Sequence, residues 1–283
     1  MVDVEFHLMT RSDAEFYRRL MDMEGWSLTI EDLDRMLHYE PEGCFIANME
    51  GHDVGMVASY LYGEFGWIGN LITIPDVRGR GVGVALMRKA VDRLNDEGAA
   101  SIRLDAVAKA IPLYRRLGFR PEYQSLRFRG PSHQHPISSA SQMNADDLED
   151  VEMLDQRFFG ANRGKMLRRV LQDFPDLCFV SRVGGRIIGY IMAKRGEEVY
   201  RIGPWICEPE HSEAASSLLR AVMNRASGED IWVGVPEENE ASVEMLKANG
   251  LAQLPPSLRM CHGICRRVDD VSGIFGIEAA EKG

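Results

Sequence analysis

The sequence predicts an α/β protein built from two copies of one unit, each with strands in a sheet and helices packed against it. Two stretches of the first half carry this prediction. Leu71–Lys89 (LITIPDVRGRGVGVALMRK) runs from an apolar, β-rich segment through a glycine-rich loop into an apolar helical pattern. Ile102–Phe119 fits a buried strand, a short helix and a glycine at the helix end. The third observation is that the second half repeats the element order of the first.

The elements before the loop follow from local patterns. Val4–Leu8 is predicted to be a strand, and helices follow at about Asp13–Met23 and Ile30–Leu37. Thr29 is a predicted N-cap for the second helix, with Asp32 three residues later completing a capping box.

Two hairpins come next. Cys44–Met49 and Val54–Tyr62 are predicted to pair around the turn Glu50–Asp53. A second hairpin returns through Trp67–Ile74, and a strand near Tyr123–Arg129 is expected to end the first copy.

The glycine-rich loop predicts an anion site. Three of the five residues of Gly79–Gly83 are glycine, and a helix follows directly. Free N–H groups at a helix start, together with the helix dipole, bind phosphate. Arg78, Arg80, Arg88 and Lys89 add positive charge. The spacing does not match the P-loop G-x-x-x-x-G-K-[ST] or the dinucleotide G-x-G-x-x-G.

Two spaced motifs resemble those of the GNAT superfamily of acyl-CoA N-acyltransferases. Arg78–Gly83 (RGRGVG) fits the pyrophosphate-loop pattern [QR]-x-x-G-x-[GA], and Ala110–Phe119 (AIPLYRRLGF) fits A-x-x-L-Y-x-x-x-G-F. The predicted order of elements is also the GNAT order. The resemblance implies two tandem GNAT folds, each a twisted mixed β-sheet flanked by helices.

Composition limits the other functional classes. The chain has 283 residues, 45% of them hydrophobic and 27% charged, with no apolar run that approaches a membrane span. A net charge of −10 argues against nucleic acid as the main partner and mildly favours an amine substrate. Five scattered cysteines predict no disulfide framework, and the Cys261–Cys265 stretch (CHGIC) lacks a partner pair at zinc-site spacing, so no metal is expected.

The second copy keeps the fold pattern but lacks the chemistry. Tyr200–Ile206 aligns with Gly66–Ile72, and both copies carry a proline six residues past the shared glycine. Where the first half has the glycine loop, the second has His211–Ala215, without glycine and with an acidic side chain that would repel a pyrophosphate. Leu246 stands at the position of Tyr114.

The expected domain organisation follows. Residues 1–130 are predicted to be the catalytic N-acetyltransferase domain, 131–136 a linker, and 137–283 a degenerate GNAT-like domain that does not bind acyl-CoA. At one position the second half matches the family pattern better than the first. Many family members carry Asn seven residues before the tyrosine; the first half has Val107 there, whereas the second half has Asn239.

The resemblance implies a sheet that splays after the fourth strand, whose free edge pairs with the pantetheine amides of acetyl-CoA, the co-substrate. The predicted coenzyme contacts are Leu71, Ile72, Thr73, Ile74, Arg78, Gly79, Arg80, Gly81, Val82 and Gly83.

Tyr114 matches the tyrosine that protonates the departing thiolate in this family. A phenol with a pKa near 10 stays protonated at neutral pH and can donate to sulfur. Asp105 is the first candidate for the base that takes a proton from the amine, and a structural aspartate bonded to backbone N–H groups is the alternative. Glu64 is the second candidate for the base.

The acceptor wall is predicted from aromatic and polar residues near the splay. Trp26 stands between the first two helices, Trp67 or Tyr60 could join it, and Asn70 could orient the amine or a water. Tandem relatives suggest further lining residues from the second half, namely Phe158, Phe159, Arg163 and Trp205.

The predicted function is transfer of an acyl group, most simply acetyl, to the amine of a small molecule or amino acid by direct reaction in a ternary complex. Protein acetylation at a lysine or N-terminus and a non-catalytic acyl-CoA sensor are the alternatives. A cytoplasmic monomer or homodimer is expected, without nucleic acid or membrane partners.

Overall fold

A computed structural model describes residues 4–26, 28–136 and 138–283 and divides the chain into two compact units. The first unit runs to Pro121 and includes Met260–Cys265 and Lys282. The second consists of Glu122–Arg259, Arg266–Glu281 and Gly283. Within the described ranges, no helix has both the length and the apolar character needed to cross a membrane.

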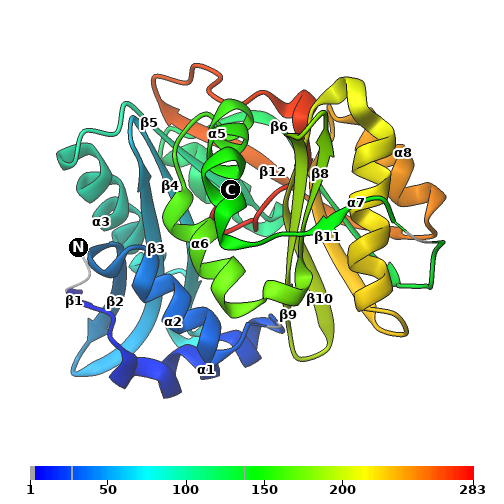
Figure 1. The fold of residues 1–283 in the computed structure, drawn as a ribbon. Helices are drawn as coiled ribbons and strands as arrows, with labels where there is room; N and C mark the ends of the chain where they lie inside the picture. Colours follow the sequence, from blue (N-terminus) through cyan, green and yellow to red (C-terminus); the bar gives the residue numbers. More distant parts are fainter. Residues whose placement is uncertain (1–3, 27, 137) are drawn as a thin grey trace. The chain divides into compact units, whose positions relative to one another are not determined.

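Up to the helix that carries Tyr114, the first unit contains the elements that the sequence predicts, in the predicted order (Figure 1). Its strands and helices are β1 (Glu5–Leu8), α1 (Ala14–Glu24), α2 (Ile30–Tyr39), β2 (Cys44–Met49), β3 (His52–Tyr62), β4 (Phe65–Thr73), α3 (Val82–Asp96), β5 (Ser101–Ala106) and α4 (Ile111–Arg116).

Local chemistry explains two of these boundaries. The predicted capping box is present, since Thr29 Oγ1 accepts the Asp32 N–H at 3.3 Å and Asp32 Oδ2 accepts the Thr29 N–H at 2.9 Å. The turn between β2 and β3 has positive φ at both Glu50 (55°) and Gly51 (81°), the geometry that matches the twist of a two-residue hairpin.

The sheet of the first unit is mixed, as predicted. Strands β1 to β4 pair antiparallel in chain order, and β5 pairs parallel with β4. Helix α3 packs on β3 and β4, where its Leu94 lies against Gly66. The end of β12 (Ala252–Gly263) lies beside β5 and adds a strand that comes from the far end of the sequence.

The strand predicted near Tyr123–Arg129 does not end the sheet of the first unit. It is β6 (Arg120–Pro131), which pairs antiparallel with β11 (Asp230–Pro236) in the second unit. The compact units therefore divide after Pro121, whereas the sequence places a domain boundary after residue 130. Within the predicted linker 131–136, Ser132 is buried, and its N–H donates to the Glu229 carbonyl at 2.8 Å.

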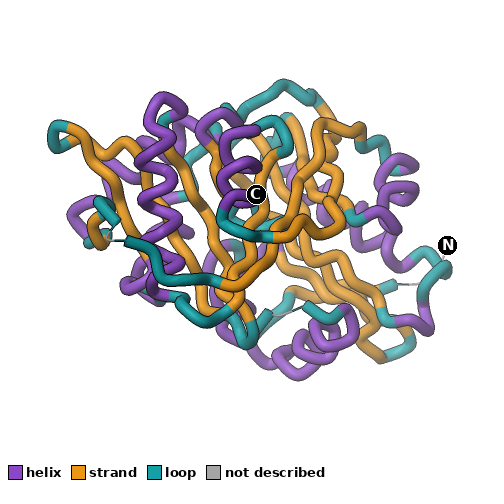
Figure 2. Tube along the Cα trace, turned by 90° about the vertical axis from the view of Figure 1, so that its right-hand side faces the viewer, coloured by secondary structure: helices purple, strands orange, loops and turns teal. Residues whose placement is uncertain are grey.

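The second unit repeats the element order of the first, and Figure 2 colours the helices and strands of the whole chain. Its remaining elements are β7 (Ser141–Gln142), α5 (Leu148–Phe159), α6 (Gly164–Asp173), β8 (Cys178–Val183), β9 (Arg186–Arg195), β10 (Val199–Cys207), α7 (Ser212–Arg225), α8 (Glu240–Ala248) and β13 (Ile274–Gly276). Alternate residues of its strands enter two apolar cores: Phe179 and Ile191 belong to the core with α7, while Val180 and Met192 belong to the core with α5 and α6.

The residues suggested as lining groups from the second half lie inside that half. Phe158 and Trp205 are 0% exposed. The Arg163 guanidinium binds the Asp155 carboxylate at 2.9 Å, with both side chains 1% exposed, and packs against Phe159. These positions are explained by the core of the second unit, because a buried Arg–Asp pair needs both partners for compensation.

Candidate functional site

Strands β4 and β5 separate part of the way along their length. They pair only from Phe65–Trp67 to Ser101–Arg103, although β4 continues to Thr73 and β5 to Ala106. On its other side β4 pairs with β3, and a bulge interrupts that ladder: Gly69 pairs with Ala58 and Ile72 with Met56, so Asn70 and Leu71 together face Val57. Past this bulge, the β5-facing edge of β4 has no strand partner among the described residues and offers backbone groups to an extended ligand.

Asn70 lies at the bulge with a left-handed φ of 51°, a conformation that Asn tolerates better than most residues. Its side chain is 4% exposed, and in the described part of the chain Oδ1 is buried without a hydrogen-bond partner. An unsatisfied buried acceptor costs roughly 1–3 kcal/mol, so its presence at a strand bulge suggests that a ligand or water supplies the missing donor.

The glycine-rich loop joins this edge to the start of α3. Gly79 and Gly81 have φ of 78° and 92°, which is why the loop requires glycine there. Gly81 is the N-cap, no side chain caps the helix, and the first turn of this 15-residue helix holds no acidic residue. Free N–H groups and the helix dipole at such a start favour an anion, which is the site predicted from the sequence. Val82 is 1% exposed and anchors the turn.

A carboxylate that the sequence reasoning missed lies between two cations of this region. Glu24, the last residue of α1, accepts from Arg78 Nη2 at 2.5 Å and from Lys109 Nζ at 2.8 Å, while Arg78 Nε donates to the Thr73 carbonyl at 3.2 Å. Burial alone would raise the pKa of Glu24, but Lys109 and then Arg78 lower it below its ordinary value. The three residues are far apart in sequence, so no local motif could indicate the cluster.

Not every predicted cation points to the loop. The Lys89 ammonium lies 5.1 Å from the Phe45 ring centroid, a cation–π contact on β2. Arg80 is exposed and lies between the two left-handed glycines. Arg78 and Arg80 belong to the loop itself, Arg88 is exposed on α3, and Lys109 joins Arg78 through Glu24.

Tyr114 lies on α4, 8% exposed, with its ring at an edge-to-face distance of 5.9 Å from Phe119. Gly83, in the first turn of α3, lies close to both α4 and β4: a Cβ added to it would be 3.9 Å from the Leu113 side chain and 3.9 Å from the Thr73 side chain. The predicted acid and the anion site are therefore held by adjoining elements. Burial raises the pKa of Tyr114 to about 12, so the phenol keeps its proton throughout the neutral range.

We expect Tyr114 to ionise at a pH well above that of an exposed tyrosine, whose pKa is about 10. The difference in tyrosinate absorbance between the native chain and Tyr114→Phe should stay near zero at about pH 10.5 and appear only near pH 12. Because the folded chain holds this proton more tightly than the unfolded chain, the free energy of unfolding should fall as pH rises from about 10 to about 12. Ionisation near pH 10 would show that the hydroxyl is solvated.

The other predicted residues divide by position. Asp105 is partly buried near the C-terminal end of β5, which is also the end at which the parallel strand β4 finishes. It interacts with other residues. Trp26 is 36% exposed and follows Gly25, which ends α1 in a left-handed conformation. Both placements are compatible with the predicted roles of base and acceptor wall, which remain predictions.

Two predicted residues are placed away from the site. Glu64 is exposed just before the N-terminal end of β4, whereas the glycine-rich loop follows the C-terminal end of this strand. The nine residues of β4, at about 3.3 Å each, separate Glu64 from the loop by about 30 Å. Because β4 and β5 are parallel and α4 follows β5, Tyr114 lies at the same end of these strands as the glycine-rich loop, opposite to Glu64. Trp67 is 1% exposed and is one of the largest fully buried side chains, a core position.

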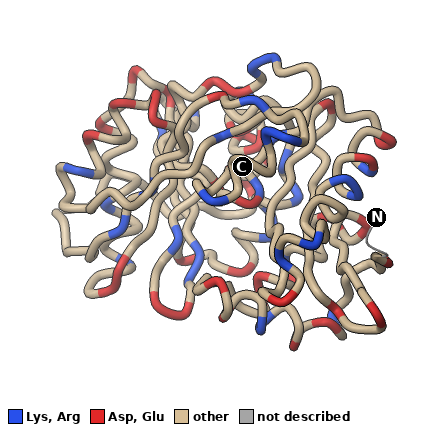
Figure 3. Tube along the Cα trace, turned by 180° about the vertical axis from the view of Figure 1, so that it is seen from behind, with Lys and Arg blue, Asp and Glu red and all other residues tan. Residues whose placement is uncertain are grey.

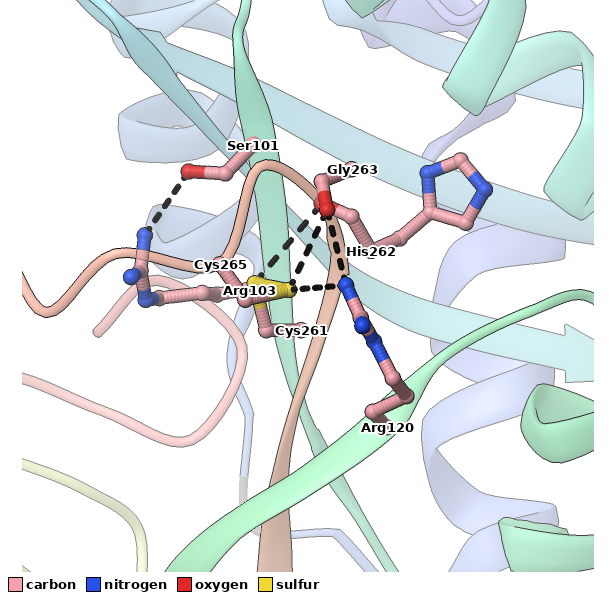
Figure 4. Close-up of a disulfide and its surroundings, with 7 residues drawn as sticks. All are labelled: Ser101, Arg103, Arg120, Cys261, His262, Gly263 and Cys265. Carbon is pink, nitrogen blue, oxygen red and sulfur yellow. Dashed lines mark hydrogen bonds between the residues drawn. A yellow bond between two sulfur atoms is a disulfide. The ribbon is translucent and has the colours of Figure 1, made fainter.

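The disulfide of the first unit was not expected from the cysteine count. Cys261 and Cys265 are bonded around a turn at Gly263, whose φ is 84° (Figure 4). The Gly263 carbonyl accepts from Arg120 Nη2 at 3.0 Å, and the Ile264 N–H donates to Ala100 at 2.9 Å. His262 points away from the sulfurs in Figure 4 and packs on Phe119 at 5.2 Å, so β12 supports the aromatic pair that holds Tyr114.

A carboxylate–histidine group in the second unit has the spacing of a cation site. Glu208, Glu210 and His211 place possible ligand atoms within 4.8 Å of one another. However, Glu208 already accepts from Arg186 at 2.6 and 2.8 Å and from Arg157 at 3.0 Å. The hydrogen bond from Arg186 is the largest cause of its lowered pKa, ahead of the opposing effect of burial. Two arginines therefore compensate this carboxylate, and the group does not indicate a metal.

The second unit lacks the glycine-rich loop and the tyrosine of the first unit at the corresponding positions. Helix α7 begins at Ser212 with Glu213 in its first turn, where α3 has no acid. Leu246, at the position of Tyr114, is fully buried in the core. The uncapped glycine-rich helix start and the buried phenol therefore occur together in the first unit.

Comparisons with known proteins identify the class. Residues 13–119 match the Acetyltransferase (GNAT) family, and residues 151–276 match the Acetyltransferase (GNAT) domain. The chain belongs to the GNAT superfamily and is a tandem GNAT-type acyltransferase.

Two curated relatives resemble most of the chain. Holothin acyltransferase of Pseudoalteromonas sp. (strain SANK 73390) is 24% identical over 85% of this chain and 81% of that protein. The uncharacterised N-acetyltransferase YitH of Bacillus subtilis (strain 168) is 22% identical over 78% of each.

Solved structures share the fold. A provisionally assigned acetyltransferase of Pyrococcus horikoshii has a TM-score of 0.84 and 21% identity, covering 99% of this chain and 96% of its own. A tandem GNAT protein from the clavulanic acid biosynthesis pathway has a TM-score of 0.64 and 13% identity, covering 92% and 98%. The tandem arrangement predicted from the internal repeat is confirmed.

Proposed function

We propose that this chain is an acetyl-CoA-dependent N-acetyltransferase that acylates the amine of a small molecule or amino acid, with its chemistry in the first unit. One observation carries the proposal: the open edge of β4 leads directly into the uncapped, glycine-rich start of α3, with buried Tyr114 on the adjoining helix. This arrangement suits an extended ligand that carries amides at one end and phosphates at the other.

Each part of the coenzyme then has a partner. Leu71–Ile74 would pair with the pantetheine amides, and Arg78–Gly83 would bind the diphosphate. The Glu24 cluster holds Arg78 and Lys109 at the mouth of the anion site. Binding both reactants side by side supplies much of the rate, because the reaction then proceeds as if it were unimolecular.

The transfer requires two proton movements. The amine, after losing a proton to Asp105 or to a water held by it, attacks the thioester carbonyl; the C–N bond forms and the C–S bond breaks. Tyr114 donates its proton to the departing thiolate. Asn70 Oδ1, which has no donor from the described chain, would accept an N–H of the amine or a water and orient it.

A small acceptor is favoured over a protein substrate. The holothin acyltransferase and a Trypanosoma brucei glucosamine 6-phosphate N-acetyltransferase, 25% identical over 45% of this chain, are named for small-molecule acceptors. Acidic and basic positions are interspersed in the view of Figure 3, and the net charge of −10 suits a cationic acceptor. We place the reaction in the cytosol, where acyl-CoA is found.

Turnover against a panel of amines tests the proposal. The full chain is incubated with acetyl-CoA and amino acids, amino sugars, polyamines or lysine peptides, with free thiol and acetylated product measured. We expect saturable thiol release with one class of small amine and none with peptides. Peptide acetylation would indicate a protein acetyltransferase, whereas coenzyme binding without thiol release would indicate a sensor.

A further inference from the structure

The second unit also has a splayed pair of strands, but its gap is filled. Strands β10 and β11 pair parallel only from Val199–Ile202 to Asp230–Val233. Past an irregularity at Gly203–Pro204, β10 pairs antiparallel with β13, Trp205 with Gly276 and Ile206 with Ile274. The Ile277 N–H donates to the Gly234 carbonyl of β11 at 2.9 Å. The C-terminal segment therefore bridges the two separated strands.

Helix α8 binds the backbone of this segment through its first turn. Asn239 Nδ2 lies 3.1, 3.2 and 3.0 Å from the carbonyl oxygens of Val271, Ser272 and Ile274. Asn239 Oδ1 accepts the Ser242 N–H at 3.0 Å, which orients the amide, and Ser242 Oγ donates to the Phe275 carbonyl at 2.6 Å. Both polar residues are buried, at 4% and 0% exposure.

The groove is shaped to the segment as well. A Cβ on Gly203 would lie 1.9 Å from the Ile277 carbonyl oxygen, and one on Gly234 would lie 2.8 Å from the Ile277 side chain. Backbone thus approaches backbone where glycine leaves room. Phe275 packs on Trp205 at 5.3 Å, and the buried Lys194 ammonium binds Glu278 at 2.5 Å.

The same places in the first unit are open. Gly203–Pro204 aligns with Gly69–Asn70 by the internal repeat, and the β4 edge beyond that point has no strand partner among the described residues. The first unit has Val107 at the position of Asn239. It therefore lacks the side-chain amide that in the second unit contacts three carbonyl groups of the C-terminal segment.

We propose that the β10–β11 groove is a peptide-strand site whose resident ligand is residues 271–278 of the same chain. The groove equivalent to the coenzyme groove is thereby closed, and the chain binds one coenzyme rather than two. This reading rests on the proposed function for the role of the first groove. It also explains why the degenerate copy keeps Asn239: the side chain holds a peptide.

Hydrogen exchange of the full-length protein, followed by mass spectrometry, tests the strand site. The amides of 274–277 should be strongly protected in the native chain. Asn239→Ala leaves the carbonyls of Val271, Ser272 and Ile274 without this donor, two of these hydrogen bonds being buried, and should speed exchange of the 274–277 amides by about 10-fold to 100-fold. Asn249→Ala is the matched control, because that amide donates to Met245 in the same helix, and it should leave the segment protected.

A second variant covers the case in which Asn239→Ala does not fold. Asn239→Asp keeps an oxygen to accept the Ser242 N–H but loses the donors, so it should also speed exchange. Fast exchange of 274–277 in the native chain, or equal protection in the Asn239 and Asn249 variants, would overturn the assignment of a resident strand.

Calorimetric titration with coenzyme A tests the stoichiometry. We expect one equivalent bound per chain. Two equivalents would show that the second groove accepts coenzyme and would overturn its closure. Absence of binding would instead remove the proposed function, while the exchange experiment would still decide whether the C-terminal segment is bound as a ligand.

Discussion

Tyr114→Phe is expected to lower kcat about 100-fold, the usual contribution of a positioned general acid, while coenzyme affinity changes little. The substitution keeps the ring that packs on Phe119 and removes only the hydroxyl. Because burial holds the phenol in its protonated form, the lost group is a proton donor throughout the neutral range. Steady-state rates and calorimetric Kd for coenzyme A measure the two effects separately.

Tyr39→Phe is the matched control, since Tyr39 is also a buried tyrosine of the first unit but lies on α2 and has no predicted catalytic role. Its kcat should match that of the native chain. Unchanged turnover in Tyr114→Phe would remove Tyr114 as the acid. A raised Kd with unchanged kcat would instead assign the hydroxyl to coenzyme binding.

Gly83→Asp should raise the Kd for coenzyme A about 100-fold. A carboxylate in the first turn of α3 opposes the helix dipole and lies within a few ångströms of the expected diphosphate, where like charges repel by about 3–4 kcal/mol at an effective dielectric constant near 20. Calorimetry at two salt concentrations checks the cause, since the loss should shrink as salt rises.

Gly83→Ala separates charge from shape. A Cβ there meets Thr73 and Leu113 at 3.9 Å, an ordinary contact, and φ is not left-handed, so binding should change by less than about fivefold. Equal losses in the Ala and Asp variants would mean that the position matters for packing and that the diphosphate lies elsewhere.

Short-range patterns predicted most of the fold. The capping box at Thr29 and the hairpin turn at Glu50–Gly51 are consequences of a few neighbouring residues, and β2 has the predicted bounds Cys44–Met49. The internal repeat extended the prediction to the second half, because two similar element orders require two similar folds.

The candidate site residues that the structure brings together are those that lie in contiguous motifs. Arg78–Gly83 and Tyr114 belong to such motifs, and the structure holds them on adjoining elements. Glu64 was predicted as a carboxylate beside the fourth strand and Trp67 as an aromatic of the acceptor wall; the structure places Glu64 at the opposite end of that strand from the loop and Trp67 in the core. Glu24 and Lys109 carry no local signal.

The sequence by itself therefore determined the two-copy α/β architecture, the superfamily and the copy that holds the glycine-rich loop, since these depend on periodicity, glycine spacing and caps. Only the tertiary structure decided that β6 pairs with β11, that β12 carries the Cys261–Cys265 turn to the first unit, and that β13 fills the second groove. The reason is physical. Such pairings join residues far apart along the chain, and an edge strand accepts any segment that satisfies its hydrogen bonds and the shape of its groove.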